Sequence, residues 1–154
     1  MRRASSSYRA ILVATDGSPQ ARRAARIAAG LASACAARLF ALHVIVERVP
    51  TLFTGAKLYA FPALSPELYA VLERQAASAL LAVEKEAQKA GVACTALRAR
   101  AKHPWRAILA AARRHGCDLI VMGAHGRGGV LGELLGGQAT QVLARSKIAV
   151  LVCR

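Results

Sequence analysis

Five short apolar segments alternate along this chain with stretches of helix-compatible sequence. This alternation predicts an α/β fold, in which a parallel sheet is covered by helices on both faces. The crossover connections of such a sheet are expected to be right-handed. The predicted strands span residues 8–14, 38–46, 92–100, 119–122 and 148–153.

Helix starts are marked by capping residues. Ser18-Pro19 and Ser65-Pro66 each combine an N-cap hydroxyl with a proline suited to the first helical position. We expect these helices to run to about residues 36 and 90, the second being closed by Gly91. The two remaining helices are expected from Pro104 to about residue 115 and over residues 138–144.

Residues 47–64 show neither the alternation of a strand nor the 3.6-residue period of a helix, and Pro50, Gly55 and Pro62 interrupt them. We predict a long, partly apolar loop that serves as a lid over a site or as a contact surface for a partner. Residues 1–7 are predicted to form a disordered basic tail, and residues 8–154 to form one domain.

Aromatic residues make up only 5% of the chain, whereas alanine is abundant, which suggests closely packed helices over the sheet. No apolar run reaches the length of a membrane span, and the first residues lack the apolar stretch of a signal peptide. A cytoplasmic protein is therefore expected. The cysteines are too far apart for zinc spacing and are expected to be buried free thiols: Cys35, Cys94, Cys117 and Cys153.

The formal net charge of +14 favours contact with polyanions. The basic residues are spread along the sequence without interleaved aromatics or a recognisable nucleic-acid-binding motif. We therefore expect no specific nucleic-acid binding and no membrane association. Weak, salt-sensitive binding to nucleic acid remains compatible with the charge.

Seven of the 12 glycines fall between Gly123 and Gly137, directly after the apolar run 119–122. Glycine permits positive φ angles and close approach of a ligand to the backbone. A strand that ends in a glycine-rich loop followed by a helix is typical of a phosphate-binding site, where backbone N–H groups meet the anion. A mobile surface loop is the alternative.

The spacing Gly123-x2-Gly126-x9-Gly136-Gly137 resembles the nucleotide-binding signature G-x2-G-x9-G-[ST] of the universal stress protein family. Segments 11–18, 42–44, 118–123 and 149–152 are also similar to strand ends of that family, in the same order. The resemblance covers almost the whole chain. One position departs from it, because Gly137 stands where the family has Ser or Thr.

The resemblance implies the strand order 3-2-1-4-5. In this order, the sheet reverses direction between the first and fourth strands and leaves a crevice at their carboxyl ends. Asp16 and Gly123 would then meet there. The family implies that this crevice binds ATP, with the following residues around it: Thr15, Asp16, Val44, Met122, Gly123, His125, Gly126, Arg127, Gly136, Gly137, Gln138 and Ala139.

Two aspartates have competing interpretations. Asp16 is expected to contact the adenosine part of the nucleotide, or else to hold the turn into the first helix. Asp118 precedes the fourth strand, so it would lie at the opposite end of the sheet as a cap or turn residue.

Hydrolysis is not expected to be efficient. The loop lacks the lysine and hydroxyl of a P-loop, and no paired carboxylates converge on a metal. Any Mg²⁺ would be held mainly by the ATP phosphates. Because Gly137 lacks a hydroxyl, one alternative is a family member that binds no nucleotide and acts through protein contacts. A slow ATPase is the other alternative.

The last strand ends the chain at an apolar edge, which invites pairing with another chain. The resemblance implies a homodimer formed through this strand. The residues expected at the interface are Ile148, Val150 and Val152.

Overall fold

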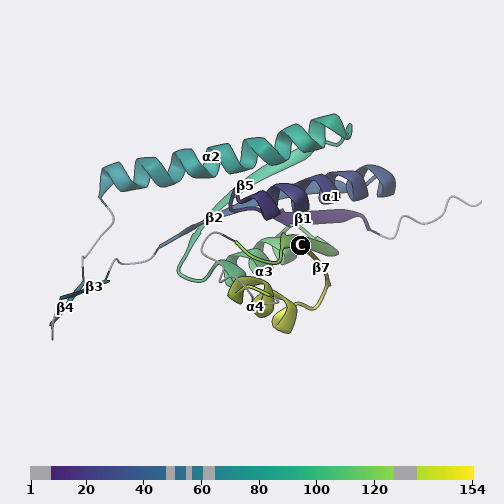
Figure 1. Ribbon diagram of the computed structural model, residues 1–154. Coiled ribbons are helices and arrows are strands. Elements are labelled where there is room, and N and C mark those ends of the chain that lie inside the picture. Colours follow the sequence, from purple (N-terminus) through teal and green to yellow (C-terminus); the bar gives the residue numbers. More distant parts are fainter. Residues whose placement is uncertain (1–7, 48–50, 55–56, 61–64, 127–134) are drawn as a thin grey trace, which may run out of the picture.

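A computed structural model of the chain describes residues 8–47, 51–54, 57–60, 65–126 and 135–154 (Figure 1). The predicted tail over residues 1–7 lies outside these ranges. The main strands are β1 (Ala10–Ala14), β2 (Arg38–Val46), β5 (Cys94–Ala101), β6 (Leu119–Gly123) and β7 (Ala149–Cys153). The helices are α1 (Pro19–Cys35), α2 (Pro66–Lys89), α3 (Pro104–Arg114) and α4 (Gly137–Arg145).

The five main strands form one sheet in the order β5-β2-β1-β6-β7, and all neighbouring pairs are parallel. This is the 3-2-1-4-5 order in the counting used above, so the predicted fold class is confirmed. The direction of strand progression reverses beside β1, whose neighbours are β2 and β6. The carboxyl ends of β1 and β6 therefore flank the topological switch point.

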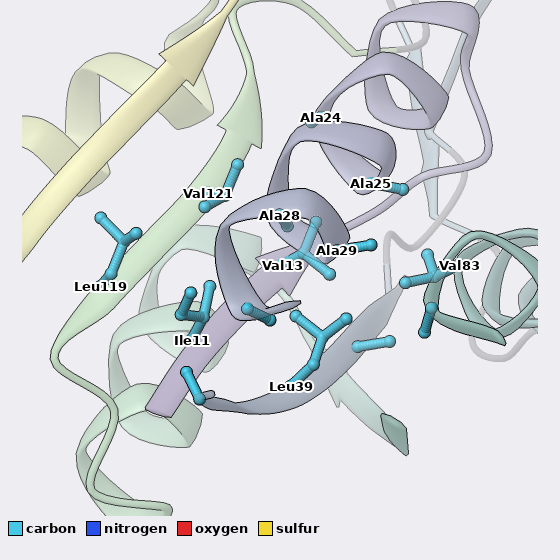
Figure 2. Close-up of a cluster of buried hydrophobic side chains, with 14 of the residues drawn as sticks. Ile11, Val13, Ala24, Ala25, Ala28, Ala29, Leu39, Val83, Leu119 and Val121 are labelled. Atoms are coloured by element: carbon cyan, nitrogen blue, oxygen red, sulfur yellow. The ribbon is translucent and has the colours of Figure 1, made fainter. Parts of the chain in front are cut away.

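Each face of the sheet is covered by two helices. On one face, a cluster of buried residues joins α1 and α2 to alternate positions of the strands, and Figure 2 shows its centre around Ile11 and Val13. On the other face, Ile108 of α3 and Val142 of α4 pack against a second cluster that includes Leu12. The strands are thus buried on both faces, as a parallel sheet requires.

Helix α1 approaches the sheet through alanines. Every buried residue of this helix is an alanine, and four of the six belong to the labelled core of Figure 2: Ala24, Ala25, Ala28 and Ala29. Small side chains let the helix backbone lie close to β1 and β6. The abundance of alanine in the sequence therefore reflects the packing of this helix.

Helix α1 ends at Ala36, which adopts the left-handed conformation with φ of 52°. Glycine takes this conformation without the steric cost that a Cβ imposes. We expect Ala36→Gly to raise the free energy of unfolding by about 1 kcal/mol. Thermal denaturation should show a rise in Tm of roughly 2–4 °C.

The reverse change provides the control for this prediction. Gly91 closes α2 with φ of 69°, and an added Cβ there would meet no atom within 4 Å. Gly91→Ala should lower the Tm by a similar amount, because only the backbone strain changes. Equal stabilities of the two variants would contradict this account.

Two sequence predictions need correction. The third main strand begins at Cys94 rather than Val92, because the Val92 N–H donates to the Ala87 carbonyl (2.9 Å) and so belongs to the end of α2. The segment predicted as a loop contains two short strands, β3 (Thr51–Thr54) and β4 (Lys57–Ala60). They pair antiparallel as a separate two-stranded sheet.

The cysteines are free thiols as predicted, but only Cys117 and Cys153 are buried, whereas Cys35 and Cys94 are partly buried, so the expected burial was wrong for these two. Burial raises the pKa of the Cys94 and Cys117 thiols from 9.0 to about 11. Since the thiolate is the reactive form, iodoacetamide at pH 8 should modify these two residues about 100-fold more slowly in the folded protein than in urea. Mass spectrometry of tryptic peptides measures the rates, and equal rates in both states would refute the expected protection.

Among the described residues, no helix is both long and apolar enough to cross a membrane.

Candidate functional site

A cavity of about 520 Å³ opens at the carboxyl ends of β1, β2 and β6. Its volume lies within the range typical of small-molecule sites. Eleven of the twelve residues predicted from the sequence line it, and Arg127 lies outside the described residues. The eleven are Thr15, Asp16, Val44, Met122, Gly123, His125, Gly126, Gly136, Gly137, Gln138 and Ala139.

The turn from β1 into α1 fixes one wall of the cavity. The Asp16 Oδ1 accepts a hydrogen bond from the Ser18 N–H (2.9 Å), and the Thr15 hydroxyl accepts one from the Gly17 N–H (3.2 Å). The Ser18 hydroxyl then caps the helix by accepting from the Ala21 N–H (3.2 Å). One oxygen of Asp16 thus performs the turn role considered from the sequence. This role is compatible with ligand contact because a carboxylate can accept several hydrogen bonds.

The second oxygen of Asp16 faces the glycine loop. A Cβ added to Gly126 would lie only 2.5 Å from the Asp16 Oδ2, and one added to Gly136 would lie 3.1 Å from the Ala124 carbonyl oxygen. A Cβ on Gly123 would come within 3.2 Å of the Gln20 Cβ. A side chain at Gly126 therefore fits only if Asp16 or the loop shifts, whereas one at Gly123 or Gly136 needs its neighbours to move by a few tenths of an ångström. Gly137 is different, since nothing lies within 4 Å of an added Cβ.

His125 lies between these glycines. Its backbone N–H donates to the Gln20 Oε1 of α1 (2.8 Å), which ties the loop to the helix. Its side-chain Nδ1 is buried and has no hydrogen-bond partner among the described residues. A buried polar atom without a partner is costly, and because solvent does not reach this nitrogen, it meets a ligand in the cavity only if the His125 ring turns.

Helix α4 directs its N-terminus at the same cavity. Gly136 is its N-cap and supplies no side chain to cap the first N–H groups. The Thr140 hydroxyl donates to the Gly136 carbonyl (3.1 Å), so this hydroxyl also serves the helix start. Uncapped N–H groups beside glycines form a place where an anion is stabilised.

Several cavity residues were not predicted as site residues. His43 of β2 is buried, and its Nδ1 donates to the Thr15 carbonyl (2.9 Å), which links β2 to the end of β1. Leu72 and Gln75 come from α2, and Pro104 and Ile108 come from α3. His43 precedes the predicted Val44, but the sequence alone gives no signal for the helix residues.

Asp118 lies at the opposite end of the sheet, as predicted. Its carboxylate accepts hydrogen bonds from the Arg9 N–H (2.9 Å) and the Ala10 N–H (3.1 Å), which confirms its turn role. Burial opposes ionisation of this carboxyl, but these hydrogen bonds outweigh it and hold its pKa below the ordinary value.

Within the described ranges, no group of three or more His, Cys, Asp or Glu side chains is arranged to hold a metal ion. Asp16 is the one carboxylate that lines the cavity in the part of the chain that the structure describes. The geometry therefore suits the binding of an anionic ligand of small-molecule size. The donors that face the anion would be backbone N–H groups and the His125 ring.

Comparisons with known proteins agree with this architecture. A universal stress protein of Thermus aquaticus is 38% identical over 148 residues, which cover 96% of this chain and 99% of the relative. The solved structure of the universal stress protein UspA from Lactobacillus plantarum is 28% identical, with a TM-score of 0.76 over 96% of this chain and 98% of that one. A universal stress protein in complex with cAMP is 25% identical, with a TM-score of 0.64 over 94% and 95% of the two chains.

A model of the universal stress protein family matches residues 7–154, nearly the full length of the sequence. The relative from Thermus aquaticus supports the same assignment over almost the whole of both chains. Fold, strand order and sequence therefore agree, and the chain belongs to the universal stress protein family.

Proposed function

We propose that this protein binds ATP in the crevice between β1 and β6 and acts as a nucleotide-dependent module of the stress response. The observation that carries the proposal is the cavity of about 520 Å³ lined by eleven of the residues that the family resemblance implies. They come from strands and loops far apart in the sequence. Their meeting at the switch point of the sheet matches the usual place of ligands in open α/β folds.

The proposed orientation is the one that the family resemblance implies. The adenine lies against Val44 at the β2 side, and the ribose lies between Asp16 and Met122. The phosphates meet the loop at Gly126 and the start of α4. The Nδ1 of His125, which has no hydrogen-bond partner among the described residues, can donate to a phosphate oxygen if the ring turns toward the cavity.

The related universal stress protein in complex with cAMP supports an adenine nucleotide as the ligand class. ATP differs from cAMP in its longer and more highly charged phosphate chain. A chain with a net charge of +14 favours the more negative ligand.

We infer binding without efficient turnover. Among the described residues that line the cavity, Asp16 is the one carboxylate, and its Oδ1 already accepts from the Ser18 N–H. A pair of carboxylates that would fix a metal and activate water is not present there. Mg²⁺, if bound, is held by the phosphates.

The test is a thermal shift with Mg-ATP, ADP, AMP and GTP, after removal of any co-purified nucleotide. ATP at 100 times its Kd should add about 2.7 kcal/mol to the free energy of unfolding. For a domain of this size, the Tm should rise by roughly 5–10 °C. The absence of any shift at millimolar nucleotide, in a protein that is folded by circular dichroism, would refute ATP binding.

A second candidate function rests on Gly137. The loop has no hydroxyl at this position, so one contact to phosphate is missing relative to the family signature. The alternative is a universal stress protein that works through protein contacts without nucleotide. The same thermal shift separates the two, because this alternative predicts no response to ATP.

Restoring the hydroxyl should strengthen binding. Gly137 has open space for a Cβ and begins α4, so Gly137→Ser is compatible with the backbone. A hydrogen bond to a charged phosphate is worth about 1.5–3 kcal/mol, and we expect the Kd for ATP to fall at least about tenfold. Isothermal titration calorimetry measures the change.

Gly137→Ala is the matched control, because it adds the Cβ without the hydroxyl. Its Kd should stay within about threefold of that of the original chain, a free-energy change below about 0.7 kcal/mol. An equal gain in both variants would show that helix stabilisation, and not a phosphate contact, is responsible.

A further inference from the structure

The positive charge is distributed unevenly between the two helical layers. The layer of α1 and α2 carries four glutamates on α2 beside its basic residues. In the layer of α3 and α4, neither helix contains an Asp or Glu, and both have arginines in their last turns. Its exposed cations in the described ranges, here called the α3–α4 basic face, are Lys102, Arg106, Arg113, Arg114, Arg145 and Lys147.

These cations form no ion pair with another residue that the structure describes. The ion pairs among the described residues involve Arg9, Lys89, Arg98 and Arg100, and none involves the α3–α4 basic face. Helices α3 and α4 pack side by side on one face of the sheet (Figure 1). The described part of this surface is therefore positive, which favours an anionic partner.

Trp105 organises part of this face. The guanidinium carbon of Arg106 lies 5.0 Å from the Trp105 ring centroid, and that of Arg145 lies 4.7 Å from it. The backbone N–H of Trp105 donates to the Gln138 Oε1 (2.9 Å), and this hydrogen bond joins the start of α3 to the start of α4. A guanidinium that rests on an aromatic ring keeps its planar set of N–H donors for phosphate oxygens, at a reduced loss of rotamer freedom.

We propose that the α3–α4 basic face binds the phosphodiester backbone of nucleic acid, independently of base sequence. Helix α3 has 11 residues and is about 16 Å long, a length of about five nucleotide steps of 3.4 Å. The cations occur at both ends of α3, so they match a repeated anion better than a single one. Arginine-to-phosphate hydrogen bonds and counterion release supply the binding free energy.

A membrane surface fits this face less well. A helix that lies on lipid presents an apolar side to the acyl chains. The apolar side of α3 is already used, because Ile108 and Ala112 are buried against the sheet. The proposal does not rest on ATP binding in the crevice.

The experiment measures fluorescence anisotropy of a labelled 20-nucleotide single-stranded RNA and of a 20-base-pair duplex DNA with the full chain, at 50–200 mM salt. We expect binding that weakens steeply with salt. The variant Lys102→Gln, Arg106→Gln, Arg145→Gln should bind at least tenfold more weakly at 50 mM salt. If all three residues contact phosphate, its log–log salt slope for RNA should be smaller by about 2.

The matched control removes three exposed arginines from the other layer, Arg22→Gln, Arg23→Gln and Arg26→Gln. It has the same net charge as the first variant, so an equal loss of affinity in both would overturn the proposal in favour of diffuse attraction. The double variant Lys102→Gln, Arg113→Gln leaves the stacking of Arg106 and Arg145 on Trp105 intact. It should reduce the log–log salt slope for RNA binding by about 1.4. It provides the test if the triple variant does not fold.

Two further readouts complete the test. Trp105 is the single tryptophan of the chain, so bound RNA should change the intrinsic emission of the original protein and of the α1 control. Vesicles with 30% phosphatidylserine report membrane binding. Binding to these vesicles without binding to either nucleic acid would overturn the proposal, as would nucleic-acid binding that leaves Trp105 emission unchanged.

Discussion

Replacing Gly126 with alanine should weaken ATP binding by about 10- to 150-fold, the equivalent of a lost hydrogen bond to a charged group. The new Cβ would lie 2.5 Å from the Asp16 Oδ2, closer than Cβ atoms approach unbonded atoms in proteins, so one of the two groups must shift. Asp16 cannot simply turn aside, because its Oδ1 holds the Ser18 N–H at 2.9 Å. Either the loop moves away from the cavity or the turn at the start of α1 is broken.

Calorimetric titration of ATP measures this effect, with Gly137→Ala as the matched control. Both variants add one methyl group to the same loop, but the methyl at position 137 meets nothing within 4 Å. We therefore expect the affinity for ATP to fall in Gly126→Ala and to stay nearly unchanged in Gly137→Ala. Unchanged affinity in Gly126→Ala would show that the nucleotide does not use the Asp16–Gly126 side of the crevice.

The double change Val150→Lys, Val152→Lys should convert a dimer into monomers. We propose that β7, at one edge of the sheet, pairs with β7 of a second copy. Leu151 of this strand is an exposed large apolar side chain, and no strand in the described part of the chain pairs with the outer edge of β7. Two lysines on each copy would place like charges together across a two-fold interface, which is strongly unfavourable.

Sedimentation velocity measures the oligomeric state, and the opposite edge of the sheet supplies a control. Leu97 and Ala99 of β5 are partly buried against the same core cluster as Val150 and Val152. Leu97→Lys, Ala99→Lys therefore carries a similar risk of destabilisation but leaves β7 unchanged. A dimer that persists in the β7 variant, or monomers in both variants, would contradict the proposed interface.

The sequence predicted the parts of this structure that depend on local patterns. The capping pairs Ser18-Pro19 and Ser65-Pro66 begin their helices as expected, and both serines accept the capping hydrogen bond. The apolar runs gave the strands to within a few residues. Strand order does not follow from such patterns, since it depends on pairing between distant segments, and it was available only through the family resemblance.

Contacts between distant residues explain what was not predicted. Arg145 lies over Trp105 although 40 positions separate them. The sequence therefore showed no sign that a basic side chain and an aromatic ring stack at this surface. Similarly, Leu72 and Gln75 reach the cavity from α2, whose placement depends on the whole sheet. The β3–β4 pairing was missed because Pro50 and Pro62 flank two segments of only four residues each.

The alanine face of α1 has a consequence for motion at the crevice. An alanine has no side-chain rotamers, so burying six of them costs no side-chain conformational entropy. The buried side of α1 therefore contributes no alternative rotamers to the interface, and only the sheet residues and the partly buried Ile27 and Leu31 can repack. The turn at Asp16 and the Gln20 contact to the glycine loop are carried by this helix, so one wall of the crevice is preorganised before any ligand arrives.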